Sequence, residues 1–371
     1  MPDESTIKQI VLIVLIIIFL IAISIGIYYI VSNTNDSSTN SNISPSTNSN
    51  NIPSTNSNTS SSTNPSPIIS GSSMIGLCYA YDRTKYTGNK CIDFEKLIGD
   101  DFRKIKAAGY NYVKTYWGYF GGEYGCLCDY SKGGMYAKVA NDTGLGVVLG
   151  LNPSIYPKDQ WGFDVRNCIL ESISKNPGAV RGIIVGNENV NGDINVARKI
   201  IEVYNDLKTR ISTNIPIGTA QQNGFWVCMN NPTKGFCKCN TDCQAAYKLL
   251  YNTLDFCGAN IYAYPFPGSN NKELNKKTLI DQFNELLPIL GKKLWITETG
   301  IPHSGGGKTL SSSVSVTFTR DIQADLIGRI MEWHNVNKDV PIFLFEAFDE
   351  PSKPDNVQGL VVEKYFGIIG E

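Results

Sequence analysis

The sequence predicts an α/β protein, a (β/α)8 TIM barrel preceded by one transmembrane helix and a disordered linker. Three observations support this prediction. Strand-like apolar runs alternate with helical patterns over residues 74–371, residues 10–31 form a long apolar run, and residues 32–73 hold few apolar side chains. The alternation is typical of parallel strands joined by helices, and the segment is long enough for a barrel of roughly 250 residues.

The apolar run over 10–31 is long enough to cross a membrane. Only Ser24 and Gly26 interrupt it, and no charged residue lies between Lys8 and Asp36. A helix of this length spans roughly 33 Å, and a bilayer core is about 30 Å thick. A cleaved signal peptide has a shorter apolar region, roughly 7–15 residues. We therefore expect an uncleaved signal anchor, with residues 1–9 as a cytoplasmic tail.

The segment after the anchor, residues 32–73, is expected to be a flexible linker. Between residues 32 and 64, 28 of 33 residues are Ser, Thr or Asn, so too little apolar surface is available to offset the entropy of ordering. All ten cysteines follow the linker, and many cysteines are typical of oxidising compartments. We expect a single-pass type II membrane protein with an extracellular or lumenal domain over 74–371.

Strand and helix patterns define that domain. The strand-like runs cover residues 74–79, 112–117, 146–151, 182–187, 215–219, 256–262, 293–298 and 341–345. The helical patterns cover residues 94–108, 164–174, 195–211, 279–290 and 317–333. The alternative is a doubly wound open sheet, but no G-x-G-x-x-G phosphate loop follows the first strand.

The composition excludes some classes of protein. The chain carries 33 basic and 34 acidic side chains, so it has no charge excess for a nucleic acid, and none is expected as a partner. Two histidines are too few for His-rich metal chemistry. Trp295 and Trp333 are expected in the core, because one lies within a strand and the other on an amphipathic helix.

Two glutamates close predicted strands and are the candidates for chemistry. Glu188 follows the fourth strand and Glu298 ends the seventh, so both should lie at the same mouth of a barrel. Each alone could be a solvated strand end. Together they suit glycosidic cleavage, which needs an acid for the leaving oxygen and a carboxylate at the sugar carbon. A separation of about 5–5.5 Å gives retention and roughly 6.5–9.5 Å gives inversion, and both stay open at this point.

Three motifs in this order resemble the signatures of glycoside hydrolase family 17, the β-1,3-glucanases and related glucanosyltransferases. They are Val-Gly-Asn-Glu at 185–188, Ile-Thr-Glu-Thr-Gly-Ile-Pro at 296–302 and Phe-Glu-Ala-Phe-Asp-Glu-Pro-Ser-Lys at 345–353. The likeness covers residues 74–371 and is closer to the fungal and bacterial members. It implies a TIM barrel and a retaining mechanism.

The resemblance also implies roles for individual residues. Glu188 would be the acid/base and Glu298 the nucleophile, and Asn187 would bind the sugar 2-hydroxyl. Glu350 and Lys353 match a family pair near the acid. The alternative for that pair is a surface ion pair at i,i+3 spacing, which contributes only a few tenths of a kcal/mol.

Tyr116 and Tyr262 match family positions near the scissile sugar, where a tyrosine hydroxyl can reach the nucleophile. The sequence departs from the family at Lys114, where an arginine is usual. A second departure is an insert over 228–243 with four cysteines. A zinc knuckle is one interpretation of it, and disulfides are favoured outside the cytoplasm. Cys78, within the first strand, is expected to be a buried thiol.

The resemblance thus implies a retaining endo-β-1,3-glucanase that acts on β-glucan, with a mildly acidic optimum and a bell-shaped pH profile. A β-1,3-glucanosyltransferase using the same residues is the main alternative, and a non-catalytic glucan-binding surface protein is another. No cofactor or metal is expected, because two carboxylates complete the reaction. We expect the catalytic domain to be a monomer.

Overall fold

The computed structural model describes residues 74–80, 90–117, 134–158, 162, 164–212, 214–232, 239–262, 272–308, 315–354 and 360–370. The predicted tail, anchor and linker over residues 1–73 lie outside the described residues. Within the described ranges, no helix has both the length and the apolar character to cross a bilayer.

Eight parallel strands form a closed barrel, as the sequence predicts. The order around the barrel is β1, β10, β7, β6, β5, β4, β3, β2, and β1 pairs with both β2 and β10 to close it. The strands are β1 (Ile75–Tyr79), β2 (Tyr112–Trp117), β3 (Gly146–Leu151), β4 (Val180–Asn187), β5 (Ile217–Gln222), β6 (Phe256–Tyr262), β7 (Leu294–Gly300) and β10 (Ile342–Leu344).

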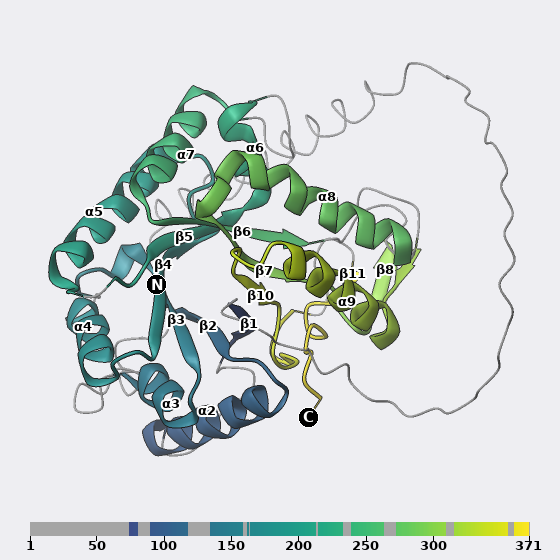
Figure 1. The fold of residues 1–371 in the computed structure, drawn as a ribbon, viewed down its shortest axis with the longest axis horizontal. Coiled ribbons are helices and arrows are strands. Elements are labelled where there is room, and N and C mark those ends of the chain that lie inside the picture. The colour runs from purple at the N-terminus through teal and green to yellow at the C-terminus, as the bar shows by residue number, and fades with distance from the viewer. Residues whose placement is uncertain are drawn as a thin grey trace, which may run out of the picture. The chain divides into compact units, whose positions relative to one another are not determined.

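Helices surround these strands (Figure 1). They are α2 (Lys90–Ala107), α3 (Met135–Thr143), α4 (Val165–Lys175), α5 (Ile194–Arg210), α6 (Asn223–Asn230), α7 (Thr241–Thr253), α8 (Lys272–Leu290) and α9 (Arg320–Val336), with short 3-10 turns at Pro153–Ile155 and Gly291–Lys293. The outer helices bury apolar residues against the barrel. In α5 these residues are Ala197, Ile200, Val203 and Leu207, at the spacing that one helix face requires.

Some element bounds differ from the prediction. β5 continues to Gln222, because its polar end still pairs with β6, residue for residue up to Asn260. The last helix begins at Arg320, since the Thr319 side chain accepts a hydrogen bond from Ile322 N and caps it. Strands β9 (Ser315–Thr317), β8 (Gly306–Lys308) and β11 (Leu360–Val361) form a small antiparallel sheet, which the sequence did not predict.

Aromatic rings fill the inside of the barrel. Trp295 is buried, as predicted, and stacks on Phe256 with ring centroids 3.9 Å apart. A Cβ on Gly182 would lie 3.2 Å from the Trp295 ring, so the indole reaches across the barrel interior from β7 to β4. Gly76 on β1 similarly makes room for Phe343 on β10. Large residues on β7 and β10 therefore face glycines on other strands, which keeps the barrel core densely packed. Trp333 is also buried, on α9.

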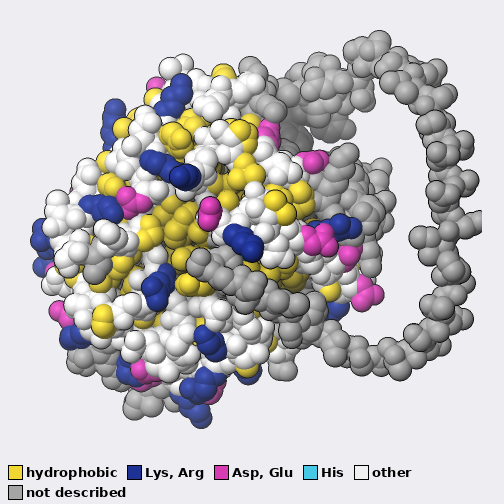
Figure 2. Space-filling view, in the orientation of Figure 1, with side chains coloured by type: hydrophobic (Ala, Val, Ile, Leu, Met, Phe, Trp, Pro, Cys, Tyr) yellow, Lys and Arg dark blue, Asp and Glu magenta, His cyan; other side chains and the backbone are white. Residues whose placement is uncertain are grey.

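The cysteines of the insert include a disulfide, the favoured interpretation. Cys239 and Cys243 are joined at the start of α7, and Cys168 on α4 is also disulfide-bonded. Cys78 and Cys257 are buried free thiols, as predicted for Cys78. Figure 2 shows basic and acidic side chains interspersed over the described part of one face, so neither sign of charge dominates there.

Candidate active site

All seven residues that the sequence nominates line one cavity of ≈ 450 Å³. Tyr116 lies on β2, Asn187 ends β4 with Glu188 directly after it, Tyr262 ends β6, Glu298 lies on β7, and Glu350 and Lys353 follow β10. Parallel barrel strands point their C-terminal ends to the same mouth, so residues far apart in the chain meet there.

The Glu298 carboxylate accepts hydrogen bonds from three side chains. Lys114 Nζ lies 2.6 Å and Tyr116 Oη 3.0 Å from Oε1, and Tyr262 Oη lies 2.6 Å from Oε2. Lys114 and Tyr116 are two residues apart on β2, so both face the same side of the strand. Burial alone would raise the pKa of Glu298. The Lys114 charge and the three hydrogen bonds outweigh it and lower that pKa, which favours the ionised form.

The Glu188 carboxyl has a different environment. Asn260 Nδ2 donates to Oε1 at 2.8 Å and Gln222 Nε2 donates to Oε2 at 3.2 Å, and both donors are neutral. Burial and then the negative charge of Glu298 raise the pKa of Glu188, and the two amide hydrogen bonds only partly oppose them. Glu188 therefore retains a proton at a pH at which Glu298 has lost its own.

The backbone at Glu188 is unusual, with a φ of 51°. A non-glycine residue seldom adopts this left-handed conformation. Here the Glu188 amide donates to Ala220 O at 2.9 Å, and the Asn191 side chain donates to the Glu188 carbonyl at 3.3 Å. These bonds fix the turn that directs the acid at the end of β4.

Asn187 and Asn260 connect the two acids. The Asn187 side-chain oxygen accepts from Lys114 Nζ at 3.4 Å and from Asn260 Nδ2 at 3.3 Å. Thr297 Oγ1 donates to the Asn260 oxygen at 2.7 Å, so the Asn260 amide nitrogen must face Asn187 and Glu188. A register shift between β6 and β7 at this point sets Asn260 beside Glu298.

Glu350 and Lys353 form a buried cluster with Glu346, not the surface pair considered as the alternative. Lys353 Nζ lies 2.7 Å from Glu350 Oε2 and 3.1 Å from Glu346 Oε1. Glu346 is only 1% exposed and Glu350 6%. Burial raises the pKa of Glu346 well above its usual value, Lys353 opposes this, and the charge of Glu350 and a hydrogen bond to it add to the rise.

Sequence reasoning did not identify four of the residues that complete this site, namely Lys114, Gln222, Asn260 and Glu346. Lys114 stood out only as a departure from the family. The signals were nevertheless present, because Lys114 precedes Tyr116 by two residues and Asn260 precedes Tyr262 by two, which places each pair on one strand face. Gln222 and Glu346 follow apolar runs, and such strand ends form barrel active sites.

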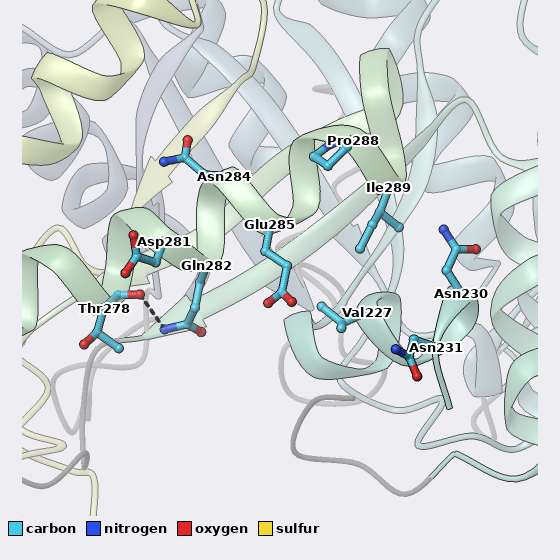
Figure 3. Close-up of a pocket in the computed structure, with 10 residues that line it drawn as sticks. All are labelled: Val227, Asn230, Asn231, Thr278, Asp281, Gln282, Asn284, Glu285, Pro288 and Ile289. Carbon is cyan, nitrogen blue, oxygen red and sulfur yellow. Dashed lines mark hydrogen bonds between the residues drawn. The ribbon is translucent and has the colours of Figure 1, made fainter. Parts of the chain in front are cut away.

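A second cavity, of ≈ 800 Å³, lies between α6 and α8. Figure 3 shows amide side chains such as Asn230, Asn284 and Gln282 around it, with Asp281 and Glu285 on the α8 side. Asp281 is exposed and Glu285 half-buried, so the cavity offers no buried acid. It is larger than the cavity at the strand ends, but it lacks the pair of contrasting carboxyls that acid–base chemistry requires.

The described residues contain no group of three or more His, Cys, Asp or Glu side chains arranged to hold a metal ion. The strand-end cavity can instead supply one ionised and one protonated carboxyl. This combination can protonate a leaving group while a carboxylate contacts the reacting carbon.

Comparison with known proteins gives a family match over most of the chain. A family model described as the BtgE/BtgC glycoside hydrolase domain matches residues 76–367. A protein of Schizosaccharomyces pombe named glucan 1,3-beta-glucosidase is 24% identical over 310 residues, covering 80% of this chain and 82% of that protein.

Solved structures of similar chains include a β-glucuronidase from Ruminococcus gnavus. Its complex with D-glucuronic acid matches 80% of this chain and 46% of that chain, with 16% identity and a TM-score of 0.47. The apo structure matches 80% of this chain and 47% of that chain, with 15% identity and a TM-score of 0.47. This chain therefore spans less than half the length of those two.

Proposed function

This chain belongs to the BtgE/BtgC glycoside hydrolase family, and from this premise we propose that it is a retaining endo-β-1,3-glucanase of glycoside hydrolase family 17. The observation that carries the proposal is the contrast between two glutamates in one cavity: a lysine and two tyrosines hydrogen-bond Glu298, whereas two neutral amides hydrogen-bond Glu188. Two carboxyls kept in different protonation states at one pH are what a glycosidase needs.

Glu298 is the nucleophile in this proposal. Its ionised oxygen attacks the anomeric carbon and forms a glycosyl ester, while the bond from that carbon to the leaving sugar oxygen breaks. The three donors on Glu298 lower its pKa, which suits a nucleophile that must later leave. Retention is proposed because the three motifs resemble those of family 17, and an ionised Glu298 suits the nucleophile of that mechanism.

Glu188 is the acid and then the base. It gives its proton to the leaving oxygen in the first step. Once Glu298 is esterified, its negative charge is gone, and that charge is one cause of the raised pKa of Glu188. The pKa of Glu188 then falls, and its carboxylate can take a proton from a water molecule that attacks the anomeric carbon. The bond from that carbon to the Glu298 oxygen breaks, which frees the Glu298 carboxylate. The cycle returns both glutamates to their starting states.

Asn187 is proposed to bind the 2-hydroxyl of the reacting sugar. Its side-chain oxygen is held by Lys114 and Asn260, so it is fixed beside both acids. A hydrogen bond there strengthens as the sugar ring flattens toward the transition state. Tyr116, Tyr262 and Phe345 also line the cavity and give a sugar ring apolar contact.

The glucan substrate is supported by the name of the fission-yeast relative, glucan 1,3-beta-glucosidase, and by the motif resemblance. Near-balanced charge suits an uncharged polysaccharide. The same residues would also serve a glucanosyltransferase, in which a sugar hydroxyl replaces water as the acceptor.

The test is a polysaccharide panel with β-1,3, β-1,4, β-1,6 and mixed linkages, digested by the purified full chain. We expect cleavage of β-1,3-glucan and loss of at least about 10³-fold in kcat on Glu298→Gln. Glu332→Gln, an exposed change on α9, is the matched control. Activity that survives Glu298→Gln contradicts the nucleophile, and products longer than the substrate indicate a transferase.

We also propose that the chain is a type II membrane protein, anchored through residues 10–31 with its barrel extracellular or lumenal. The apolar run supports the anchor, and the Cys239–Cys243 disulfide suits an oxidising compartment. Membrane fractionation with protease protection tests this. Recovery of the full chain in the soluble fraction contradicts the anchor.

A further inference from the structure

Lys353 lines the cavity at the strand ends and contacts two buried carboxyls, of which Glu350 lines the cavity and Glu346 does not. Lys353 Nζ contacts Glu350 Oε2 and Glu346 Oε1 at 2.7 and 3.1 Å. The proposed mechanism uses neither Glu346 nor the position of this ammonium. Burying these charged groups costs free energy, because charges are tolerated in a protein interior only when they are paired.

Glu346 and Glu350 contact the same Lys353 ammonium, at 3.1 and 2.7 Å, and both carboxyls are buried. When two buried carboxyls share one cation, the second negative charge is strongly disfavoured, so one of the two keeps its proton. Glu346 is the more deeply buried of the two, so the neutral form is favoured there. With a neutral Glu346, one carboxylate balances one ammonium, and the cluster has no net charge.

The backbone holds Glu346 rigidly in this place. Its amide donates to Phe366 O at 3.2 Å, and its carbonyl accepts from Ile368 N at 3.0 Å. Lys353 Nζ also lies 4.4 Å from the centroid of the Phe345 ring, which itself lines the cavity. The ammonium is thus fixed by two carboxyl oxygens and one aromatic face.

An ammonium group has three N–H donors. Two are used by Glu346 and Glu350, and Lys353 lines the same cavity as Glu188 and Glu298. The third N–H is therefore available to an oxygen in the cavity. The Lys353 side chain is 23% exposed, whereas those of Glu346 and Glu350 are 2% and 8% exposed, so Lys353 is the most open member of the cluster.

We propose that Glu346 is a positioning residue that acts as a neutral carboxylic acid, accepting from Lys353 and donating to Glu350, so that Lys353 presents one N–H to a hydroxyl of the bound sugar. This inference rests on the proposed function. Other titratable groups near the cluster are Cys78 on β1, Tyr116 on β2 and Glu363, which lines the cavity.

Glutamine is the sharpest probe, because its amide imitates a protonated glutamate. In Glu346→Gln, the side-chain oxygen can still accept from Lys353 and the NH2 can still donate to Glu350. In Glu346→Leu, both bonds are lost in a similar volume. For Glu346→Leu we expect KM on a β-1,3-gluco-oligosaccharide to rise about tenfold with kcat changed less than about threefold. Glu346→Gln should restore KM to within about threefold of wild type.

A double-variant cycle tests whether Glu346 acts through Lys353. Lys353→Met should raise KM by a similar factor, and Glu346→Leu combined with Lys353→Met should be no worse than Lys353→Met alone. If the rise in KM of the double variant equals the product of the two single rises, the inference is overturned, because Glu346 would then act independently of Lys353. A Glu346→Gln enzyme as impaired as Glu346→Leu also overturns it, because the site would then need a negative charge.

Two controls separate the possible failures. If Glu346→Leu does not fold, as judged by its thermal transition, Glu346→Gln and Lys353→Met alone decide. A wild-type KM for Lys353→Met, or an impaired Glu346→Gln enzyme that folds, then overturns the inference. Wild type and Glu332→Gln must cleave the glucan in every series. If they do not, the proposed function fails, and if they do, only the Glu346 assignment is at stake.

Discussion

Lys114 Nζ lies 2.6 Å from Glu298 Oε1, and the two side chains are only 1% and 7% exposed. A buried ion pair adds little net stability, because desolvation of both charges offsets their attraction. Its value is chemical, since a neighbouring cation keeps a buried carboxylate ionised. The pair thus resolves the conflict between burying Glu298 and keeping it reactive.

Replacing Lys114 should disable the carboxylate. In Lys114→Met, burial is no longer opposed by a cation, so the pKa of Glu298 rises and the acidic limb of the pH profile moves to higher pH. We expect kcat/KM at neutral pH to fall by about 10²–10³-fold. Lys114→Arg keeps the charge and is the matched variant. An acidic limb that stays in place in Lys114→Met would contradict the role of the ion pair.

The pH profile of the wild type should be bell-shaped. Glu298 must be ionised, so activity is lost as the pH falls through its lowered pKa. Glu188 must be protonated, so activity is lost as the pH rises through its raised pKa. The two limbs should lie on either side of the usual glutamate pKa of about 4.3. Measurement of kcat/KM from about pH 3 to 9 checks this, and a flat profile argues against the assignment.

Asn260 should influence the acid, because its hydrogen bond lowers the pKa of Glu188. In Asn260→Ala we expect the alkaline limb to move to higher pH and kcat/KM to fall about tenfold, since Glu188 and Asn187 both lose a partner. Asn195→Ala, an exposed change on α5, is the control. If Asn260→Ala leaves the alkaline limb unchanged, Asn260 only supports the fold.

Trp295 should stabilise the barrel strongly. Its ring fills the space beside Gly182. If the ring is removed, Gly182 has no side chain that could fill the cavity left behind. We expect Trp295→Ala to lower the free energy of unfolding by about 3–5 kcal/mol, and Trp295→Phe to lower it by less. Denaturant unfolding measures both. A loss under about 1 kcal/mol for Trp295→Ala would mean that the barrel core repacks.

The sequence predicted the barrel well because its signals are local. Strands β2, β3 and β6 are short apolar runs and begin and end where the pattern does. The antiparallel sheet of β8, β9 and β11 was missed, because its strands are two or three residues long and pair across distant loops. Short segments of this kind have no periodicity that could be recognised.

For the site, the sequence by itself determined which residue types stand at the strand ends, and so it nominated Glu188, Glu298 and their five companions. Only the tertiary structure decided how these residues differ. Lys114 and three hydrogen bonds lower the pKa of Glu298, whereas burial and the charge of Glu298 raise the pKa of Glu188. The physical reason is that burial and the charges that surround a carboxyl come from strands far apart in the chain, and closure of the barrel brings them together.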